Sequence, residues 1–154
     1  MTTKTFTQNV LVPTDFSKAS KLALEAAHQI AAQNDAKLTL VHIYDPRGVL
    51  FGGEPGLEYG HGIPKDEEEK IHGAMRELVE QRLGDLAKVK TALVVSESPA
   101  KGIVDYAEKE GVDLIVISTH GRTGLRRMMI GSVAERVVRH AHCPVLTLRS
   151  KLQD

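Results

Sequence analysis

The chain has 154 residues, 42% of them hydrophobic, and its 20 lysines and arginines balance 20 aspartates and glutamates. This length and apolar content predict a single domain, residues 1–154, with one hydrophobic core. The zero net charge excludes a global field that would attract nucleic acid or an anionic membrane, so any anion site must be local. Cys143, the single cysteine, excludes an intrachain disulfide. Residues 1–15 lack the apolar run of a signal peptide or membrane span, which predicts a cytoplasmic protein without membrane insertion.

The chain opens with alternating strand-like and helix-like patterns. An apolar run at 9–13 precedes a stretch at 17–34 in which alanines and leucines recur at steps of three and four residues. Ser17 is a candidate N-cap for this helix. After a second apolar run at 37–43, the segment 45–64 carries six glycines and three prolines. A loop of this length in a compact domain is uncommon and often functional, so this segment is expected to form a flap.

The next elements are a helix near 65–87 and a strand at 91–95. Gly73 and Gly84 should each weaken that helix by about 1 kcal/mol relative to alanine. The third helix is better marked than the second, since Ser98 can cap it and Pro99 suits its first position.

Gly111 suits the end of the third helix, and the apolar run 113–118 follows it. A helix from about Ser132 to Ala141 and a strand at 144–148 complete the order β-α-β-α-β-α-β-α-β. This alternation predicts an α/β fold: a doubly wound, Rossmann-like, open five-stranded parallel sheet with helices on both faces. In such a sheet, ligands bind beyond the carboxyl ends of the strands, where the strand order reverses.

Polar residues and glycines gather at that edge, after the first, second and fourth strands. The chain contains neither G-x-G-x-x-G after a strand nor G-x-x-x-x-G-K-[ST], which argues against an ordinary dinucleotide enzyme and a Walker-type NTPase. The candidate phosphate loop therefore follows the fourth strand.

Four stretches resemble the universal stress protein family in order and spacing: "LVPTDFS", "LVHI", "DLIVISTHGRTG" and "GSVAERVVRHAHCPVL". The nucleotide-binding branch of that family resembles G-x-x-G, nine residues, then G-[ST]. This chain has Ser118, Gly121, the nine residues 122–130, Gly131 and Ser132. The first motif glycine is thus a serine here, and the remaining spacing fits.

The resemblance implies a site for an adenine nucleotide, namely ATP, with any Mg²⁺ held mainly by the phosphates. Asp15 matches the family residue near the ribose, and Pro13 and Thr14 match its neighbours. Ile43 matches the residue whose backbone faces adenine. The matches to the phosphate-loop positions are Ile117, Ser118, Gly121, Gly131, Ser132, Val133 and Ala134.

Local physics supports an anion site at the last helix independently of the resemblance. A helix that begins at Ser132 offers unpaired amides and the positive end of its dipole. Gly121 and Gly131 can take positive φ and let the backbone approach a phosphate. In the alternative interpretation, Ser132-x-x-Glu135 is a capping box whose carboxylate repels phosphate. Asp15 likewise has an alternative, compatible role as the N-cap of the first helix.

Three other polar features have simpler interpretations. The cluster "HAHC" at 140–143 is expected to be a helix end rather than a metal site, because histidine suits a helix C-terminus and cysteine is often buried. His42 is expected to be a strand residue with its hydrogen bonds satisfied in or near the core. His120 is a poor candidate for a general base, because nothing in the sequence fixes a water beside it.

The resemblance predicts an ATP-binding regulatory protein of the universal stress class, in which nucleotide occupancy alters the choice of a protein partner. Two alternatives stay open: a slow ATPase or phosphotransferase, and a nucleotide-free interaction module. In the family resembled, the last strand, here 144–148, pairs with its own copy, which implies a homodimer. Ser118 directly follows a β-branched run, so we expect an extended backbone there and little cost from the missing glycine.

Overall fold

The computed structural model describes residues 7–47, 62–84, 88–120 and 130–149. Within these ranges strands and helices alternate throughout, as the sequence predicts. The elements are β1 (Asn9–Pro13), α1 (Lys18–Gln33), β2 (Lys37–Tyr44), α2 (Lys65–Leu83), β3 (Val89–Val95), α3 (Pro99–Lys109), β4 (Leu114–Ser118), α4 (Ser132–His140) and β5 (Val145–Leu148).

The strands form one five-stranded sheet in the order β3-β2-β1-β4-β5, and all neighbouring strands are parallel. The chain enters at the central strand β1, moves through β2 to the edge strand β3, and then crosses to β4 on the other side of β1. This confirms the predicted doubly wound parallel sheet. The strand order reverses between β1 and β4, and the carboxyl ends of these two strands therefore mark the expected ligand crevice.

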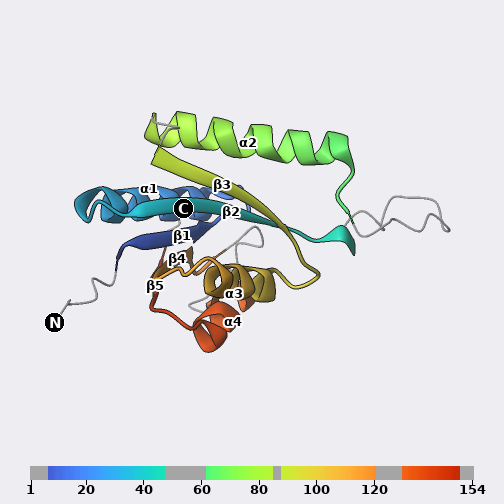
Figure 1. The fold of residues 1–154 in the computed structure, drawn as a ribbon. Helices are drawn as coiled ribbons and strands as arrows, with labels where there is room; N and C mark the ends of the chain where they lie inside the picture. Colours follow the sequence, from blue (N-terminus) through green and yellow to red (C-terminus); the bar gives the residue numbers. More distant parts are fainter. Residues whose placement is uncertain (1–6, 48–61, 85–87, 121–129, 150–154) are drawn as a thin grey trace, which may run out of the picture.

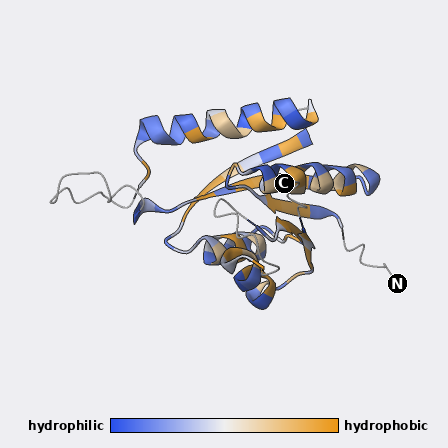
Figure 2. Ribbon diagram, turned by 180° about the vertical axis from the view of Figure 1, so that it is seen from behind, coloured by the Kyte–Doolittle hydropathy of each residue, from blue (hydrophilic) through white to orange (hydrophobic). Residues whose placement is uncertain are grey.

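Two helices cover each face of the sheet: α1 and α2 lie on one side, and α3 and α4 on the other (Figure 1). Alternate residues of each strand supply the two cores. Val10 of β1 packs with Leu24 and Met75 on the α1/α2 side, whereas the next residue, Leu11, packs with Val137 of α4 on the opposite side. The central strands β1 and β4 are accordingly mostly apolar, while the outer helix surfaces are polar (Figure 2).

The helix ends follow the capping signals. The Ser17 side chain accepts a hydrogen bond from the Ser20 amide at the start of α1, and Ser98 does the same for the Lys101 amide at the start of α3. Gly84 terminates α2 in the left-handed conformation, with φ of 69°. The prediction that Gly84 weakens the interior of this helix is therefore wrong, because α2 ends at Leu83.

The two edges of the sheet are β3 and β5. On β5, the side chain of Leu146 is 38% exposed. Most of the predicted flap, residues 48–61, lies outside the described residues. No helix in the described ranges has the length and apolar character needed to span a membrane.

Candidate functional site

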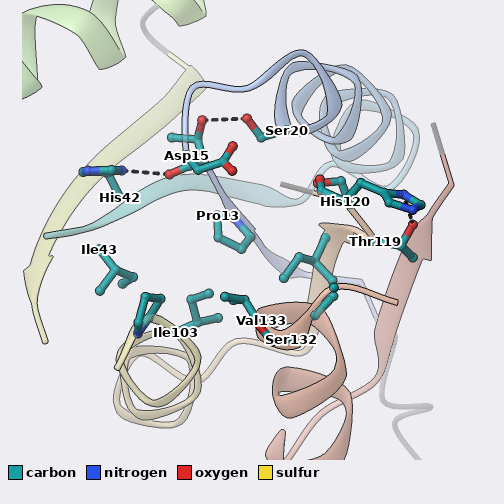
Figure 3. Close-up of a pocket in the computed structure, with 16 residues that line it drawn as sticks. Pro13, Asp15, Ser20, His42, Ile43, Ile103, Thr119, His120, Ser132 and Val133 are labelled. Atoms are coloured by element: carbon teal, nitrogen blue, oxygen red, sulfur yellow. Dashed lines mark hydrogen bonds between the residues drawn. The ribbon is translucent and has the colours of Figure 1, made fainter. Parts of the chain in front are cut away.

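A cavity of about 300 Å³ opens at the carboxyl edge of the sheet, beside the switch point between β1 and β4 (Figure 3). The predicted site residues that line it are Pro13, Thr14, Asp15, Ile43, Ile117, Ser118, Gly131, Ser132, Val133 and Ala134. The remaining predicted residue, Gly121, lies outside the described residues. Six further residues that were not predicted also line the cavity: Ser20, His42, Pro99, Ile103, Thr119 and His120.

The loop after β1 is held by a directed chain of hydrogen bonds. The buried Thr14 hydroxyl accepts from the Phe16 amide at 3.0 Å and lies 3.1 Å from the Ser20 hydroxyl. Because the Ser20 hydroxyl donates to the Ser17 carbonyl oxygen at 2.9 Å, Thr14 is the donor in its contact with Ser20. The loop is thereby tied to the first turn of α1.

Asp15 lies within this loop, and one of its carboxylate oxygens accepts the Ser17 amide at 3.0 Å. This is an Asx turn, which closes the loop just before α1 begins. Ser17 is the N-cap of α1, so the alternative interpretation of Asp15 as the cap is wrong. The half-buried Asp15 side chain lies at the wall of the cavity (Figure 3).

His42 reaches the same loop from the end of β2 (Figure 3). Its Nδ1 lies 2.8 Å from the Thr14 carbonyl oxygen. Since a carbonyl oxygen only accepts, Nδ1 carries the proton. The ring also packs against Phe16, with centroids 4.9 Å apart and planes tilted by 47°. The prediction of a hydrogen-bonded strand histidine is confirmed, but its place on the cavity wall was missed.

One wall of the cavity is apolar, and two of its residues, Pro99 and Ile103, come from the first turns of α3. Helix α3 approaches β2 closely at Gly102, where a Cβ atom would lie 2.9 Å from Ser96 Cβ and 3.0 Å from Ile43 Cγ2. A sequence signal for this wall existed. Pro99 opens a helix at the ligand edge, and the spacing of four residues places Ile103 on the same face.

The start of α4 lies beside this wall and also lines the cavity. Gly131 occupies the N-cap position and has no side chain to cap the helix, and Ser132 is the first helical residue. Glu135 pairs with Arg139 one turn further along α4. The capping-box interpretation of Ser132 and Glu135 is therefore wrong. The first-turn amides of α4, with the positive end of the dipole, stand at the cavity, and in the described part of the chain no side chain caps them.

Position 131 requires a glycine because another backbone segment comes very close to it, and not because of its backbone angle φ. Its φ is −59°, so the expectation that it takes positive φ is wrong. Its amide donates to the Thr119 carbonyl oxygen at 2.6 Å, and a Cβ atom on Gly131 would lie 2.9 Å from that same oxygen. Side chains rarely come that close to a backbone atom, so glycine allows α4 to start directly against the end of β4.

Ser118 is the last residue of β4 and pairs with Leu148 of β5, which confirms the extended backbone predicted there. Its hydroxyl donates to the His120 carbonyl oxygen at 3.0 Å. Thr119 is 3% exposed, and its amide donates to the Leu148 carbonyl oxygen at 2.9 Å. The Thr119 hydroxyl lies 3.0 Å from Nδ1 of His120. The end of β4 is thus held by its own side chains and by β5.

The ionisable side chains on the cavity wall are those of Asp15, His42 and His120. Among the described residues, no lysine or arginine lines the cavity. Among the described residues, backbone amides at the start of α4 and the Ser132 hydroxyl are the hydrogen-bond donors that suit an anion at this place. The combination of an apolar wall, a carboxylate and an uncapped helix start suits a ligand with an apolar ring at one end and an anionic group at the other.

The remaining polar features lie outside the cavity. Beyond β2, the Arg47 guanidinium hydrogen-bonds to Asp45 at 2.8 Å and holds the pKa of that half-buried carboxyl below its usual value. His140 is the last residue of α4, as expected for a helix end, and His142 lies 3.6 Å from Glu108. The described residues contain no group of three or more histidine, cysteine or acidic side chains arranged to hold a metal ion.

Comparison with known proteins finds relatives of this chain in one family. The model of the universal stress protein family matches residues 7–149. Universal stress protein MJ0531 of Methanocaldococcus jannaschii is 35% identical over 148 residues, covering 96% of this chain and 85% of that protein. The solved structure of protein MJ0577 has a TM-score of 0.77 at 30% identity, covering 97% of this chain and all of that one. A universal stress protein solved in complex with cAMP has a TM-score of 0.70 at 27% identity, with 94% and 98% of the two chains covered.

Proposed function

Because the chain belongs to the universal stress protein family, we propose that it binds ATP in the cavity at the carboxyl edge and acts as a nucleotide-dependent regulatory module. Nucleotide occupancy orders the loops around the cavity and changes which protein partner the surface fits. Under this proposal the chain is one cytoplasmic domain, residues 1–154, that works as a homodimer and is not primarily a catalyst.

The observation that carries the proposal is the start of α4. Gly131 leaves the first-turn amides without a side-chain cap, and it occupies a place where a Cβ atom would collide with the Thr119 carbonyl oxygen. Uncapped amides at a helix start bind phosphate through hydrogen bonds and through the helix dipole. The apolar wall and Asp15 line the same cavity, which supports a nucleoside attached to that phosphate as the ligand.

The proposed arrangement assigns each part of the nucleotide to one part of the wall. The adenine ring packs against Ile43, Pro99 and Ile103, and the Asp15 carboxylate accepts hydrogen bonds from the ribose hydroxyls. The phosphates lie at Ser132 and the amides that follow it, and Mg²⁺ is held mainly by the phosphate oxygens. A relative of similar fold has been solved with cAMP, which supports adenine as the base.

Regulation requires a surface that a partner protein binds, and we place self-association at β5. This strand is at the sheet edge, and Leu146 on it is partly exposed. Pairing of two β5 strands about a two-fold axis would cover the open β5 edge of each copy in one isologous contact. The Thr119 amide and the Leu148 carbonyl oxygen connect β5 directly to the loop beside the cavity.

Mass spectrometry of freshly purified, denatured protein tests the proposal, together with a thermal-shift titration of nucleotide-stripped protein with ATP. We expect adenine nucleotide to be released and the melting temperature to rise with ATP concentration. Absence of both would favour the nucleotide-free interaction module. Multiple turnovers of ATP that scale with protein and disappear in Asp15→Asn would favour the slow ATPase.

A further inference from the structure

We propose that His42 is a positioning residue for Asp15. It fixes the loop after β1 so that the Asp15 carboxylate stands ready for the ribose before any nucleotide arrives. The inference rests on the proposed function, because the ribose contact of Asp15 is part of it. His42 itself acts through the loop backbone and not as the main contact to the ribose.

The loop needs to be held, because Phe16 has a φ of 63°. This is the left-handed region, which a residue with a Cβ atom rarely adopts and which persists only where the surrounding structure enforces it. Phe16 directly follows Asp15, so relaxation of Phe16 to negative φ would turn the Asp15 side chain away from its present place. Besides its own bond to the Ser17 amide, the direction of the carboxylate therefore depends on whatever enforces this φ.

From the helix side, hydroxyl groups enforce the conformation. The Phe16 amide donates to the Thr14 hydroxyl, which is tied in turn to Ser20. These bonds fix the amide of Phe16, but they do not fix its ring. They also leave the peptide group between Thr14 and Asp15 to be held from elsewhere.

From the sheet side, β2 supplies the missing restraints. The Thr14 amide donates to the Val41 carbonyl oxygen at 2.8 Å, which extends the parallel ladder by one residue. The Thr14 carbonyl oxygen, which belongs to the peptide group leading into Asp15, accepts from Nδ1 of His42 at 2.8 Å. The same imidazole ring packs against the Phe16 ring. One side chain thus restrains the residues on both sides of Asp15.

The position of His42 explains why these two contacts come from one residue. His42 follows Val41 at the carboxyl end of β2 and lies on the α1/α2 side of the sheet, where α1 begins. Ile43, the next residue, points to the opposite side and forms part of the apolar wall. Adjacent residues of β2 therefore serve the two ends of a nucleoside: Ile43 faces the base, and His42 arranges the loop that meets the sugar.

Three variants separate the two contacts of His42. His42→Asn places an amide N–H near the position of Nδ1 but removes the ring. His42→Phe keeps a ring against Phe16 but removes the donor. His42→Leu removes both. His72→Leu is the matched control, because His72 lies on α2, away from the cavity, and pairs with Glu68 on the helix surface.

The experiment compares titrations of each variant with ATP and with 2′,3′-dideoxy-ATP, alone and combined with Asp15→Asn. We expect His42→Leu to weaken ATP binding about tenfold, His42→Asn to recover part of that loss, and His72→Leu to leave binding unchanged. The loss should disappear for the dideoxy nucleotide, and it should not add to the loss caused by Asp15→Asn. In the ligand-free protein, amide hydrogen exchange at Phe16 and Ser17 should be faster in His42→Leu than in His42→Asn.

The outcomes distinguish this inference from the proposed function. If the unmodified protein does not bind ATP, the proposed function fails and this inference fails with it. If the unmodified protein binds ATP and His42→Leu binds it equally well, the inference alone is overturned. Equal losses for ATP and dideoxy-ATP would also overturn it, because His42 would then not act through the ribose contact. Should His42→Leu fail to fold, His42→Phe and His42→Asn provide the same comparison.

Discussion

The Thr119 carbonyl oxygen and Gly131 are in closer contact than any residue with a side chain would allow. The Gly131 amide donates to this oxygen at 2.6 Å, and a Cβ atom on Gly131 would lie 2.9 Å from it. The contact joins the end of β4 to the start of α4 and so sets where the first-turn amides of that helix stand. The proposed phosphate site is therefore defined by a distance between two backbone segments.

Gly131→Val should abolish ATP binding while the protein stays folded. The added side chain must displace α4 or the end of β4, which moves the amides away from the phosphate. Overpacking of this kind destabilises proteins by about 1–3 kcal/mol, and the site is at the surface edge of the sheet, so the fold should survive. Isothermal titration with ATP and circular dichroism measure the two effects.

Gly73→Ala is the control for the Gly131 substitution. Gly73 lies within α2, and a Cβ atom there would meet nothing within 4 Å. This variant should bind ATP normally and gain about 0.8–1 kcal/mol of stability from helix propensity. A folded Gly131→Val protein with unchanged ATP affinity would show that α4 does not hold the phosphate.

Ser118→Gly should change ATP affinity by less than about threefold, or roughly 0.6 kcal/mol. Ser118 has the extended backbone of β4, so a glycine there relieves no strain. Its hydroxyl is engaged with the His120 carbonyl oxygen, and loss of that one bond should leave the loop nearly unchanged. The measurement is a pair of isothermal titrations, with Gly121→Val as a variant expected to lose binding. A large gain in affinity for Ser118→Gly would mean that the serine impairs the site.

The sequence predicted the architecture well because hydrophobic periodicity and capping residues are local signals. Ser17 and Ser98 cap the helices they were expected to cap, and Ser118 ends a strand as its β-branched neighbours indicate. The errors arose where a residue's role depends on a distant segment. Nothing near Gly131 in the sequence shows that Thr119 is its neighbour, so a requirement for space was interpreted as a requirement for positive φ.

The candidate site was predicted from two loops and one strand, and the contribution of Pro99 and Ile103 of α3 to its apolar wall was missed. Ile103 has the pattern of an ordinary core residue, since α3 buries one face against the sheet. Its exposure to the cavity depends on the close approach of Gly102 to Ile43, which is a tertiary contact. His42 was expected in or near the core for a related reason. Its place on the cavity wall depends on a tertiary contact, that of the end of β2 with the loop after β1.

Thr147→Pro should weaken the proposed homodimer at least about tenfold. The carbonyl oxygens of Pro144, just before β5, and Leu148, at its end, accept the amides of Ile115 and Thr119. The alternation along a parallel strand therefore directs the Thr147 amide to the open edge. Proline removes this donor without removing a bond to β4. Thr147→Ala, which keeps the amide, is the control. Sedimentation velocity of the unmodified protein at micromolar concentration should show a dimer, and a monomer there would contradict the proposed contact.

Cys143 should react slowly with thiol reagents in the folded protein. Partial burial raises the pKa of the Cys143 thiol, and the nearby Asp113 carboxylate raises it further. Because the folded pKa lies above the unfolded value of about 8.5, the thiol keeps its proton longer in the folded state. The contribution of this pKa shift to the free energy of unfolding is fully present below the unfolded pKa of Cys143. It is lost as the pH rises through the folded pKa. Carboxymethylation rates between about pH 7 and 10 in native and in urea-unfolded protein test this; equal rates would refute it.

Isothermal titration of nucleotide-stripped protein with ATP, beside the same titration of Gly131→Val, decides whether the cavity binds the nucleotide. We expect saturable binding of one nucleotide per chain to the unmodified protein, and no binding to the folded variant. Absence of saturable binding to the unmodified protein at about 1 mM ATP, where even a Kd of that size corresponds to about −4.1 kcal/mol, would overturn the proposed function.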